Sequence, residues 1–271
     1  FTRNIYEAAR LWLGRLRGGL AMASVVGCGG FSAITGSSVA CAAAMGRIAV
    51  PEMLKFGYAP ALATGAVAIG GTLGSLIPPS VLFILYGVFA EQSIGRLFIA
   101  AVIPGLISLL AYLVVIYVWA TLRKADAPSP NVSFSWPEKW QAVKACWGIV
   151  FIFVSIIGGI YGGLFTPTEA AGVGATLTLL LGVVTRRLNV PAIVSALKES
   201  VFQSSMIFLI AVGGKLYVSF IALTGISASF VEWLTHGDYS LALVMLFIIA
   251  LYLVLGMFLD SIGIILLTLP I

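Results

Sequence analysis

The chain alternates between long apolar runs and short polar stretches that carry most of its charges. An α-helix rises 1.5 Å per residue, so about 20 apolar residues cross the roughly 30 Å hydrocarbon core of a bilayer. Five runs have about that length or more, at residues 59–90, 97–121, 142–163, 168–185 and 201–224. The pattern predicts an all-α protein that crosses a membrane several times.

The uncharged run from Gly18 to Gly46 does not fit this scheme. As one helix it would be about 44 Å long, which is too long for one span and too short for two. Its middle reads GFSAITGSSVA, where Gly, Ser and Thr favour an unwound turn. We therefore expect a re-entrant hairpin over residues 18–50, in which two half-length helices enter and leave the membrane on the same side.

The basic residues support this topology. Arginines beside an apolar stripe in the first 17 residues predict an interfacial arm helix over 1–17. With the hairpin in place, all 15 Lys and Arg residues except Arg96 and Lys215 fall on one face of the membrane. The positive-inside rule makes this the cytoplasmic face. An ordinary span at 18–46 would scatter the charges over both faces.

Residues 74–80 read GSLIPPS and interrupt the first long span. Proline has no backbone N–H and its ring clashes with the preceding helical turn, so two consecutive prolines after a glycine-rich turn unwind a helix. Unwound backbone at membrane depth persists only where it is buried in protein or lines a cavity. A proline kink whose backbone groups are satisfied by neighbouring helices is the alternative. We expect a broken transmembrane helix and a following span within residues 51–122.

The last part of the chain repeats this organisation. SASFVEWLTHGDY predicts a second arm helix at 226–240, and an interrupted apolar run predicts a second, truncated hairpin at 241–271. A gapless shift that places Ser37 on Asp260 also places Ser38 on Ser261. Because the two copies begin on opposite faces of the membrane, the pattern is typical of the inverted repeats of secondary transporters. A polar connector at 123–141 and three transmembrane helices at 142–225 complete the expected organisation, and we expect the chain to be a fragment that lacks both ends.

Composition excludes several classes of protein. Only 9% of the residues are charged and 61% are hydrophobic, whereas soluble proteins have about 25% charged residues. The net charge of +5 indicates membrane orientation and not nucleic-acid binding. The three cysteines lack paired spacing and the single histidine, His236, has no Cys or His cluster around it, so we expect no disulfide framework and no metal bound by such residues. We expect no cofactor apart from Na⁺ as the coupling ion.

The interruptions of the apolar runs hold the candidate site residues. Hydroxyl groups and unwound backbone carbonyls are oxygen ligands that suit a hard cation such as Na⁺, and the N-termini of half-helices favour an anion. A carboxylate in the middle of an apolar run is costly and therefore functional by default, which applies to Asp260; a protonated or water-exposed carboxyl is the alternative. Around Gly36 the alternative is helix packing through small side chains. The candidate cation- and substrate-binding residues are Thr35, Gly36, Ser37, Ser38, Thr72, Gly74, Pro78, Pro79, Ser80, Asp260 and Ser261.

Two other charged residues in apolar surroundings have different interpretations. In TPTEAAG, Thr166 occupies the N-cap position, Pro167 the first helical position, and Glu169 lies three residues after the cap, which predicts a capping box. Lys215 could extend to the membrane surface, pair with a carboxylate or contact a substrate, and the sequence does not distinguish these roles.

Together these stretches resemble the large permease subunit of the tripartite ATP-independent periplasmic (TRAP) transporters, the DctM-like family. The resembling stretches, in chain order, are GFSAITGSSVA, IAVPEMLKFGY, GTLGSLIPPS, IGRLFIAAVIPG, GLFTPTEAAGVGA and GMFLDSIGIILLTLPI. The resemblance implies an elevator-type symporter of the bacterial inner membrane that uses a sodium gradient to take up an organic acid, such as a C4-dicarboxylate, another carboxylate or sialic acid. It also implies two protein partners, a periplasmic solute-binding protein and a small membrane subunit. The family's second Pro-Pro motif is expected beyond Ile271.

Other functions would leave a similar pattern. A sodium/carboxylate elevator symporter that works without a binding protein shares the membrane organisation. An intramembrane serine hydrolase built on Ser37 or Ser38 would need a general base, but His236 is predicted near the outer surface and these serines deep on an inward hairpin. No span shows the polar stripe of a passive channel. The sequence favours the transporter that depends on a binding protein, and it does not name the acid, the number of coupled ions or the oligomeric state.

Overall fold

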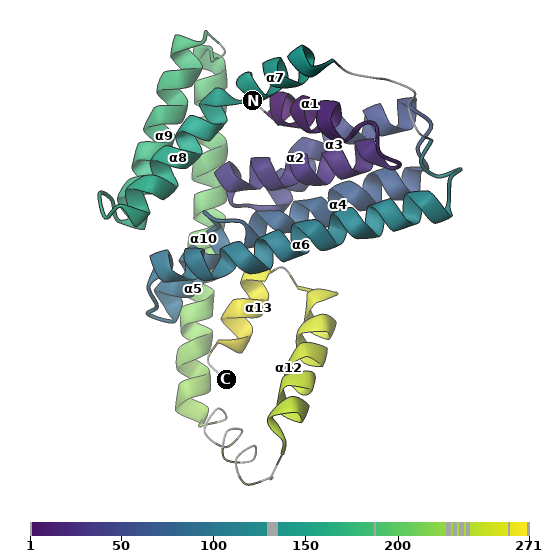
Figure 1. Ribbon diagram of the computed structural model, residues 1–271. Helices are drawn as coiled ribbons and strands as arrows, with labels where there is room; N and C mark the ends of the chain where they lie inside the picture. Colours follow the sequence, from purple (N-terminus) through teal and green to yellow (C-terminus); the bar gives the residue numbers. More distant parts are fainter. Residues whose placement is uncertain are drawn as a thin grey trace. The chain divides into compact units, whose positions relative to one another are not determined.

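The structure is a computed structural model, which describes residues 2–128, 135–186, 188–225, 239–259 and 261–269 and the single positions 229, 232 and 236. The chain forms two compact units, residues 1–184 and 185–271, and each is described by itself. The described residues form α-helices joined by turns, which confirms the predicted all-α class (Figure 1).

The first unit contains the helices up to residue 184. They are α1 (Thr2–Leu13), α2 (Gly19–Thr35), α3 (Ser38–Lys55), α4 (Pro60–Leu76), α5 (Val81–Phe89), α6 (Ile94–Leu122), α7 (Trp136–Lys144), α8 (Trp147–Tyr161) and α9 (Pro167–Val184). The second unit contains α10 (Val190–Thr224), α12 (Leu241–Gly256) and α13 (Ser261–Thr268).

Four helical stretches among the described residues are long and apolar enough to cross a membrane. They are Pro60–Phe89, which contains α4 and α5, then Ile94–Leu122, Pro167–Val184 and Val190–Thr224. A fifth is obtained if α7 and α8, which are bent by 49° relative to each other, count as one span. The five lie over the five apolar runs that the sequence predicts, as a polytopic membrane protein requires. By contrast, α2 and α12 are apolar but have only 17 and 16 residues, fewer than the roughly 20 of a full crossing.

The core of the first unit lies between α1, α2, α3, α4 and α6 (Figure 1). Small residues dominate the contacts of α2, α3 and α4, which lets these backbones approach closely, as at other helix interfaces in membranes. Met45 and Leu73 fill the remaining space and are fully buried. A smaller core of Ile152, Ile156 and Ala170 joins α8 and α9, which run antiparallel. The packing of small residues in the first core fixes α2 and α3 against α4.

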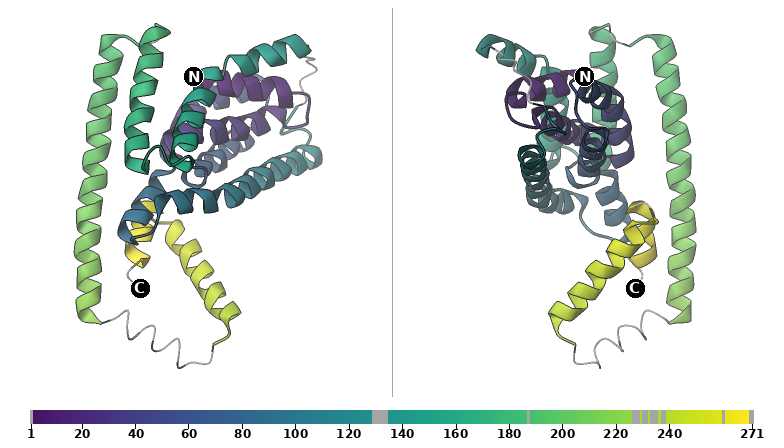
Figure 2. Two further views of the ribbon diagram at one scale, coloured as in Figure 1. Left: turned by 60° about the vertical axis from the view of Figure 1, so that its left-hand side comes forward. Right: turned by 90° about the vertical axis from the view of Figure 1, so that its right-hand side faces the viewer.

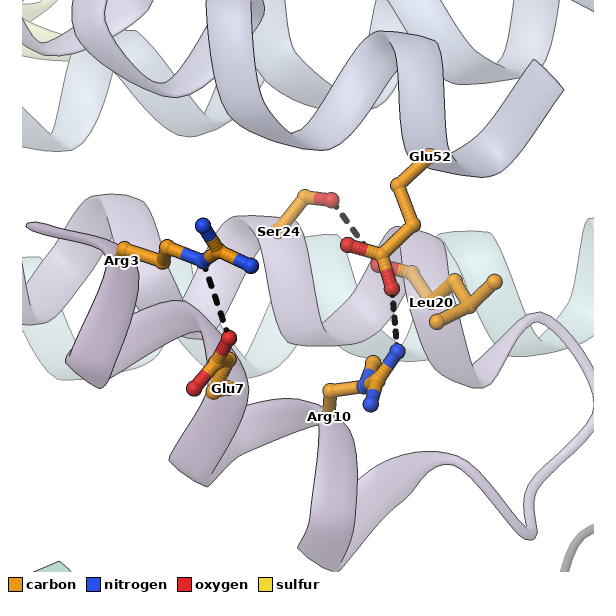
Figure 3. A network of polar contacts seen from close by, with 6 residues as sticks. All are labelled: Arg3, Glu7, Arg10, Leu20, Ser24 and Glu52. Carbon is orange, nitrogen blue, oxygen red and sulfur yellow. Dashed lines mark hydrogen bonds and ion pairs between the residues drawn. The ribbon is translucent and has the colours of Figure 1, made fainter. Parts of the chain in front are cut away.

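The arm helix α1 is held to α3 by charge as well as by packing (Figure 3). The guanidinium of Arg10 donates a hydrogen bond to the carboxylate of Glu52 near the end of α3, and both side chains are mostly buried. Tyr6 is fully buried in the same contact. Its burial, and then the nearby Glu52 carboxylate, raise the pKa of Tyr6. A second ion pair, Arg3–Glu7 at 3.0 Å, is exposed and lies within α1.

The arm helix is shorter than predicted, because α1 ends at Leu13 and not at residue 17. A turn follows, and Gly18 has a φ of +72°, in the left-handed region that residues other than glycine rarely adopt. This glycine redirects the chain into α2, so the arm and the hairpin are separate helices.

The predicted connector at 123–141 contains the start of a helix, because α7 begins at Trp136. The backbone N–H of Ser135 donates to the carboxylate of Glu138 at 2.8 Å, as in a capping box. Pro137 lies in the first turn, where its missing N–H has no cost. This local signal starts a helix within a stretch that its polar composition marks as a linker.

The long helix α10 begins at Val190, earlier than the predicted span at 201–224, and continues without interruption (Figure 2). Its start is fixed by Asn189, whose side-chain carbonyl accepts the backbone N–H of Ala192 at 3.0 Å. Lys198 and Glu199 therefore belong to the helix itself.

The second unit repeats the break pattern of the first hairpin. α3 begins at Ser38 and α13 begins at Ser261, the two residues that the gapless shift aligns. Within the unit, α13 packs on α10, and Tyr252 of α12 lies 2.7 Å, oxygen to oxygen, from Thr268 of α13. Of the predicted second arm at 226–240, the structure describes residues 229, 232, 236, 239 and 240.

Candidate functional site

The first hairpin turns at Gly36 and Ser37, which we call the tip. Gly36 has a φ of +60° and its N–H donates to the carbonyl of Ser32 at 2.9 Å, which ends α2. The hydroxyl of Ser37 accepts the backbone N–H of Ala40 at 3.3 Å and so caps the start of α3. The tip is therefore a defined turn between two helices, at the position where the sequence predicts it.

The helix formed by α4 and α5 is interrupted at residues 77–80, which we call the break. The N–H of Ile77 donates to Leu73 at 2.8 Å as the last regular helical hydrogen bond. Pro78 and Pro79, joined by a cis peptide bond, have no N–H to donate to the carbonyls four residues earlier. One of these carbonyls, that of Ser75, instead accepts the hydroxyl of Ser80 at 2.8 Å.

The tip and the break are in direct contact. The N–H of Val81, which would continue the helix, donates to the carbonyl of Gly36 at 3.1 Å. A Cβ atom on Gly36 would lie 2.6 Å from the carbonyl oxygen of Pro79, and one on Gly74 would lie 2.7 Å from the carbonyl carbon and oxygen of Ser37. Two interruptions that are about 40 residues apart in sequence thus meet through glycine, because no larger residue allows this approach.

The contact leaves backbone oxygens without a hydrogen-bond donor. Among the described residues, no donor reaches the carbonyls of Ile77, Pro78 and Pro79. Such carbonyls are hard oxygen ligands that suit a cation like Na⁺. The helices α3 and α5 also begin here. The first N–H groups of each helix form the positive end of its dipole, and this end favours an anion. The residues present therefore fit both a small cation and a carboxylate.

Two threonines of the predicted site do not direct their hydroxyls to these carbonyls. Thr72 lies on an exposed part of α4, where its hydroxyl donates to Ile69 at 2.6 Å and lies 3.0 Å from the hydroxyl of Tyr112 on α6. This placement differs from the one that the sequence suggests, since Gly74 faces the tip and Thr72 is rotated by about 200° from it on the helix. Thr35 donates to the carbonyl of Phe31 at 3.2 Å, one turn before the tip.

The remaining candidates belong to the second unit. Ser261 is the first residue of α13. Asp260 lies outside the described residues, so its predicted role stays a prediction. Lys215 is exposed on α10, and no carboxylate lies within ion-pair distance of it in the described part of the chain.

The capping box predicted at the start of α9 is confirmed. The carboxylate of Glu169 accepts the N–H of Thr166 at 2.8 Å and its hydroxyl at 2.9 Å. In return, the N–H of Glu169 donates to the Thr166 hydroxyl at 3.3 Å. Glu169 is thus engaged in fixing the helix start.

An apolar cavity of about 190 Å³ adjoins the break. It is lined by Ile77, Pro78, Val102, Leu106, Phe153, Ile157 and Tyr161. Its lining is almost entirely apolar, so a charged substrate does not fit there. The polar groups of the site are instead those at the contact between the tip and the break.

Two groups of the contact are not among the predicted site residues, namely the carbonyl of Ser75 and the amide of Val81. The first is detectable in the sequence, because a proline at position 79 always removes the donor for the carbonyl of residue 75. The second depends on which helices become neighbours, and no local pattern reports this.

The fold and the contact define a class, that of polytopic helical membrane proteins with a hairpin tip packed against a broken helix. Over residues 1–271, the sequence matches the family described as "Tripartite ATP-independent periplasmic transporter, DctM component". The chain belongs to this family.

Named relatives extend this result. The chain is 38% identical over 273 residues to the C4-dicarboxylate TRAP transporter large permease protein DctM of Pseudomonas aeruginosa, covering 100% of this chain and 63% of that protein. It is 33% identical to the ectoine TRAP transporter large permease protein TeaC of Halomonas elongata (100% and 63% covered) and 33% identical to the sialic acid TRAP transporter large permease protein SiaM of Vibrio cholerae (99% and 62%). The chain therefore spans somewhat less than two thirds of the length of these relatives, which are named as permeases and not as enzymes.

Proposed function

We propose that this chain is part of the large permease of a TRAP-type transporter that carries a carboxylate-bearing organic acid into the cell together with Na⁺. The observation that carries this proposal is the contact between the tip and the break, where unpaired carbonyls and two helix N-termini occur together. Membership in the DctM family supports the same conclusion.

The chemistry of the contact suggests how the two solutes are accommodated. The carbonyls of Ile77, Pro78 and Pro79 would bind Na⁺ at the ends of α2 and α4, where the helix dipoles are negative. The N-termini of α3 and α5 would bind the carboxylate of the substrate. A cation that is bound next to the anion lowers the cost of bringing the anion into the membrane, which is the physical basis for coupling the two.

The proposal names the class of acid, those that bear a carboxylate, and not a single compound. The named relatives carry C4-dicarboxylate, ectoine and sialic acid in their names, and each of these molecules bears a carboxylate. We propose that Asp260 and Ser261 of the aligned second hairpin also take part in binding the ion or the substrate, and that Asp260 selects between coupling by Na⁺ and by a proton.

We further propose that the permease lies in the bacterial inner membrane, receives its substrate from a periplasmic solute-binding protein and is braced by a small membrane subunit. An elevator movement of the hairpins would give access to each side in turn. Membership in the DctM family and the four to five candidate spans among the described helices support this part of the proposal.

The test is uptake into liposomes that contain the full-length permease and its small subunit. Labelled succinate, ectoine and N-acetylneuraminate are supplied with the cognate binding protein under an inward Na⁺ gradient or an equal K⁺ gradient. We expect uptake of one of these acids with Na⁺ only. Uptake that is independent of Na⁺, or unaffected by Asp260→Ala combined with Ser37→Ala, would contradict the proposal.

The same assay without the binding protein distinguishes a transporter that depends on a binding protein from a symporter that works without one. If uptake retains its full rate, the protein is a symporter that works without a binding protein. If uptake is lost, the dependence on a binding protein is established.

A further inference from the structure

A cluster of tryptophan and lysine side chains lies where α1 packs against α7. The rings of Trp12 and Trp136 meet edge to face, with centroids 5.8 Å apart and planes at 90°. The ammonium of Lys139 lies 5.6 Å from both ring centroids, within cation–π distance. Trp140 and Lys144 continue the cluster along α7. We call these five residues the Trp–Lys surface.

The residues of α7 are segregated by helical geometry. At 3.6 residues per turn, one arc of about 140° contains Trp136, Lys139, Trp140, Val143 and Lys144. Glu138, the one acidic residue of α7, lies on the opposite side, and its carboxylate is engaged with the backbone N–H of Ser135 at 2.8 Å. The surface therefore combines aromatic and cationic groups without an acidic group of its own helix.

The aromatic rings of the surface are exposed although they are large. Trp136 is 64% exposed, Trp140 55% and Trp12 43%. An indole has an apolar body and a polar N–H, which makes the headgroup layer of a membrane its preferred environment. The edge-to-face contact and the cation–π contacts hold two of the rings in place, so the surface is ordered before it meets a partner.

The charges nearby are predominantly positive. Arg15 and Arg17 are exposed on the turn that follows α1, close in sequence to Trp12. Lys144 is exposed at the end of α7. The acidic Glu7 of α1 is paired with Arg3. The surface is thus complementary to an anion that lies at the level of the indole rings.

We propose that the Trp–Lys surface binds the headgroup of an acidic phospholipid at the membrane interface. The indoles lie among the glycerol and carbonyl groups of the lipids, and Lys139 and Lys144 contact the phosphate and the additional negative charge of the headgroup. The site differs from the contact between the tip and the break and does not depend on what the protein transports.

The test places a photoreactive amino acid within the surface. Val143, which is 39% exposed on the same face of α7, is replaced by p-benzoylphenylalanine in the full-length permease. The protein is reconstituted with its small subunit in vesicles of phosphatidylcholine and phosphatidylglycerol in equal amounts. After illumination, mass spectrometry measures the ratio of the two lipid adducts.

We expect phosphatidylglycerol adducts to exceed phosphatidylcholine adducts by roughly threefold or more. The double variant Lys139→Gln/Lys144→Gln should bring the ratio to about one, whereas Lys139→Arg/Lys144→Arg should retain the preference because the charge is kept. Lys198→Gln, which removes an exposed lysine of α10, is the matched control and should not change the ratio.

Three results would overturn the proposal. One is an equal yield of the two lipid adducts in the unaltered surface, and another is a preference that survives the glutamine double variant. The third is crosslinking to the small subunit in place of lipid, because this would make the surface a protein interface.

Discussion

Gly74 faces the peptide group of Ser37 so closely that even a methyl group would collide with it. An added Cβ would lie 2.7 Å from the carbonyl carbon and oxygen of Ser37. These two atoms belong to the backbone and cannot rotate away. Gly65, on the same helix α4, has no atom within 4 Å of an added Cβ. The two glycines therefore separate the effect of the contact from the general effect of alanine on a helix.

We expect Gly74→Ala to reduce uptake at least tenfold by separating the tip from the break. Gly65→Ala should leave uptake unchanged and stabilise α4 by up to about 1 kcal/mol through helix propensity. Initial uptake rates in liposomes, normalised to the amount of folded protein, measure both. Equal effects of the two variants would show that the contact has no functional importance.

Ser80 offers a second test at the scale of one residue. Its buried hydroxyl is the donor for the carbonyl of Ser75, which has lost its backbone donor to Pro79. Ser75 donates its own hydroxyl to the carbonyl of Thr72 at the same distance of 2.8 Å, but that carbonyl lies within α4 and keeps its helical donor.

Ser80→Ala should therefore destabilise the protein by about 1–3 kcal/mol, because the partly buried carbonyl of Ser75 is left unpaired. Ser75→Ala should cost less than about 0.5 kcal/mol. Denaturant unfolding of the purified protein in detergent gives both values. A destabilisation by Ser75→Ala that matches that of Ser80→Ala would contradict the assignment.

At the scale of elements, the ion pair between Arg10 and Glu52 connects the arm helix α1 to α3 (Figure 3). The two side chains are 30% and 22% exposed, so water screens their attraction only partly. The pair Arg3–Glu7 within α1 is 79% and 45% exposed and serves as an internal comparison.

A double-mutant cycle of Arg10→Ala and Glu52→Ala should give a coupling free energy of about 1–2 kcal/mol in stability. The cycle of Arg3→Ala and Glu7→Ala should give about 0.5 kcal/mol or less, as is usual for exposed pairs four residues apart on a helix. Similar coupling in the two cycles would mean that the arm is not held to the hairpin by this charge pair.

Much of the arrangement of elements could be predicted from the sequence, because each prediction rests on a local physical constraint. Helix rise against bilayer thickness indicated the spans and the hairpin, and the missing N–H of Pro78 and Pro79 indicated the break. The start of α7 was missed although Ser135 to Glu138 has the same cap and glutamate spacing as Thr166 to Glu169. The polar composition of residues 123–141 indicates a linker, whereas the capping pattern within it starts a helix.

At the scale of the whole molecule, the limits of prediction lie in the contacts between elements. The direction of Thr72 depends on which face of α4 meets the hairpin, and the amide of Val81 reaches Gly36 only because two distant segments pack together. Hydropathy and residue spacing predict neither the direction of Thr72 nor the hydrogen bond of the Val81 amide. The candidate site was therefore predicted as a set of interruptions, while their meeting was found in the structure.

The proposed binding of Na⁺ at the contact between the tip and the break can be measured without substrate or partner proteins. A ligand that binds only the folded state raises its stability by RT ln(1 + [L]/Kd). Thermal unfolding of the purified full-length permease is therefore followed over increasing NaCl, with KCl at equal ionic strength as the reference. We predict that Tm rises with Na⁺ but not with K⁺, that Gly65→Ala retains this rise and that Gly74→Ala abolishes it. An equal response to the two salts, or a full Na⁺ response in folded Gly74→Ala protein, would show that this contact does not bind Na⁺.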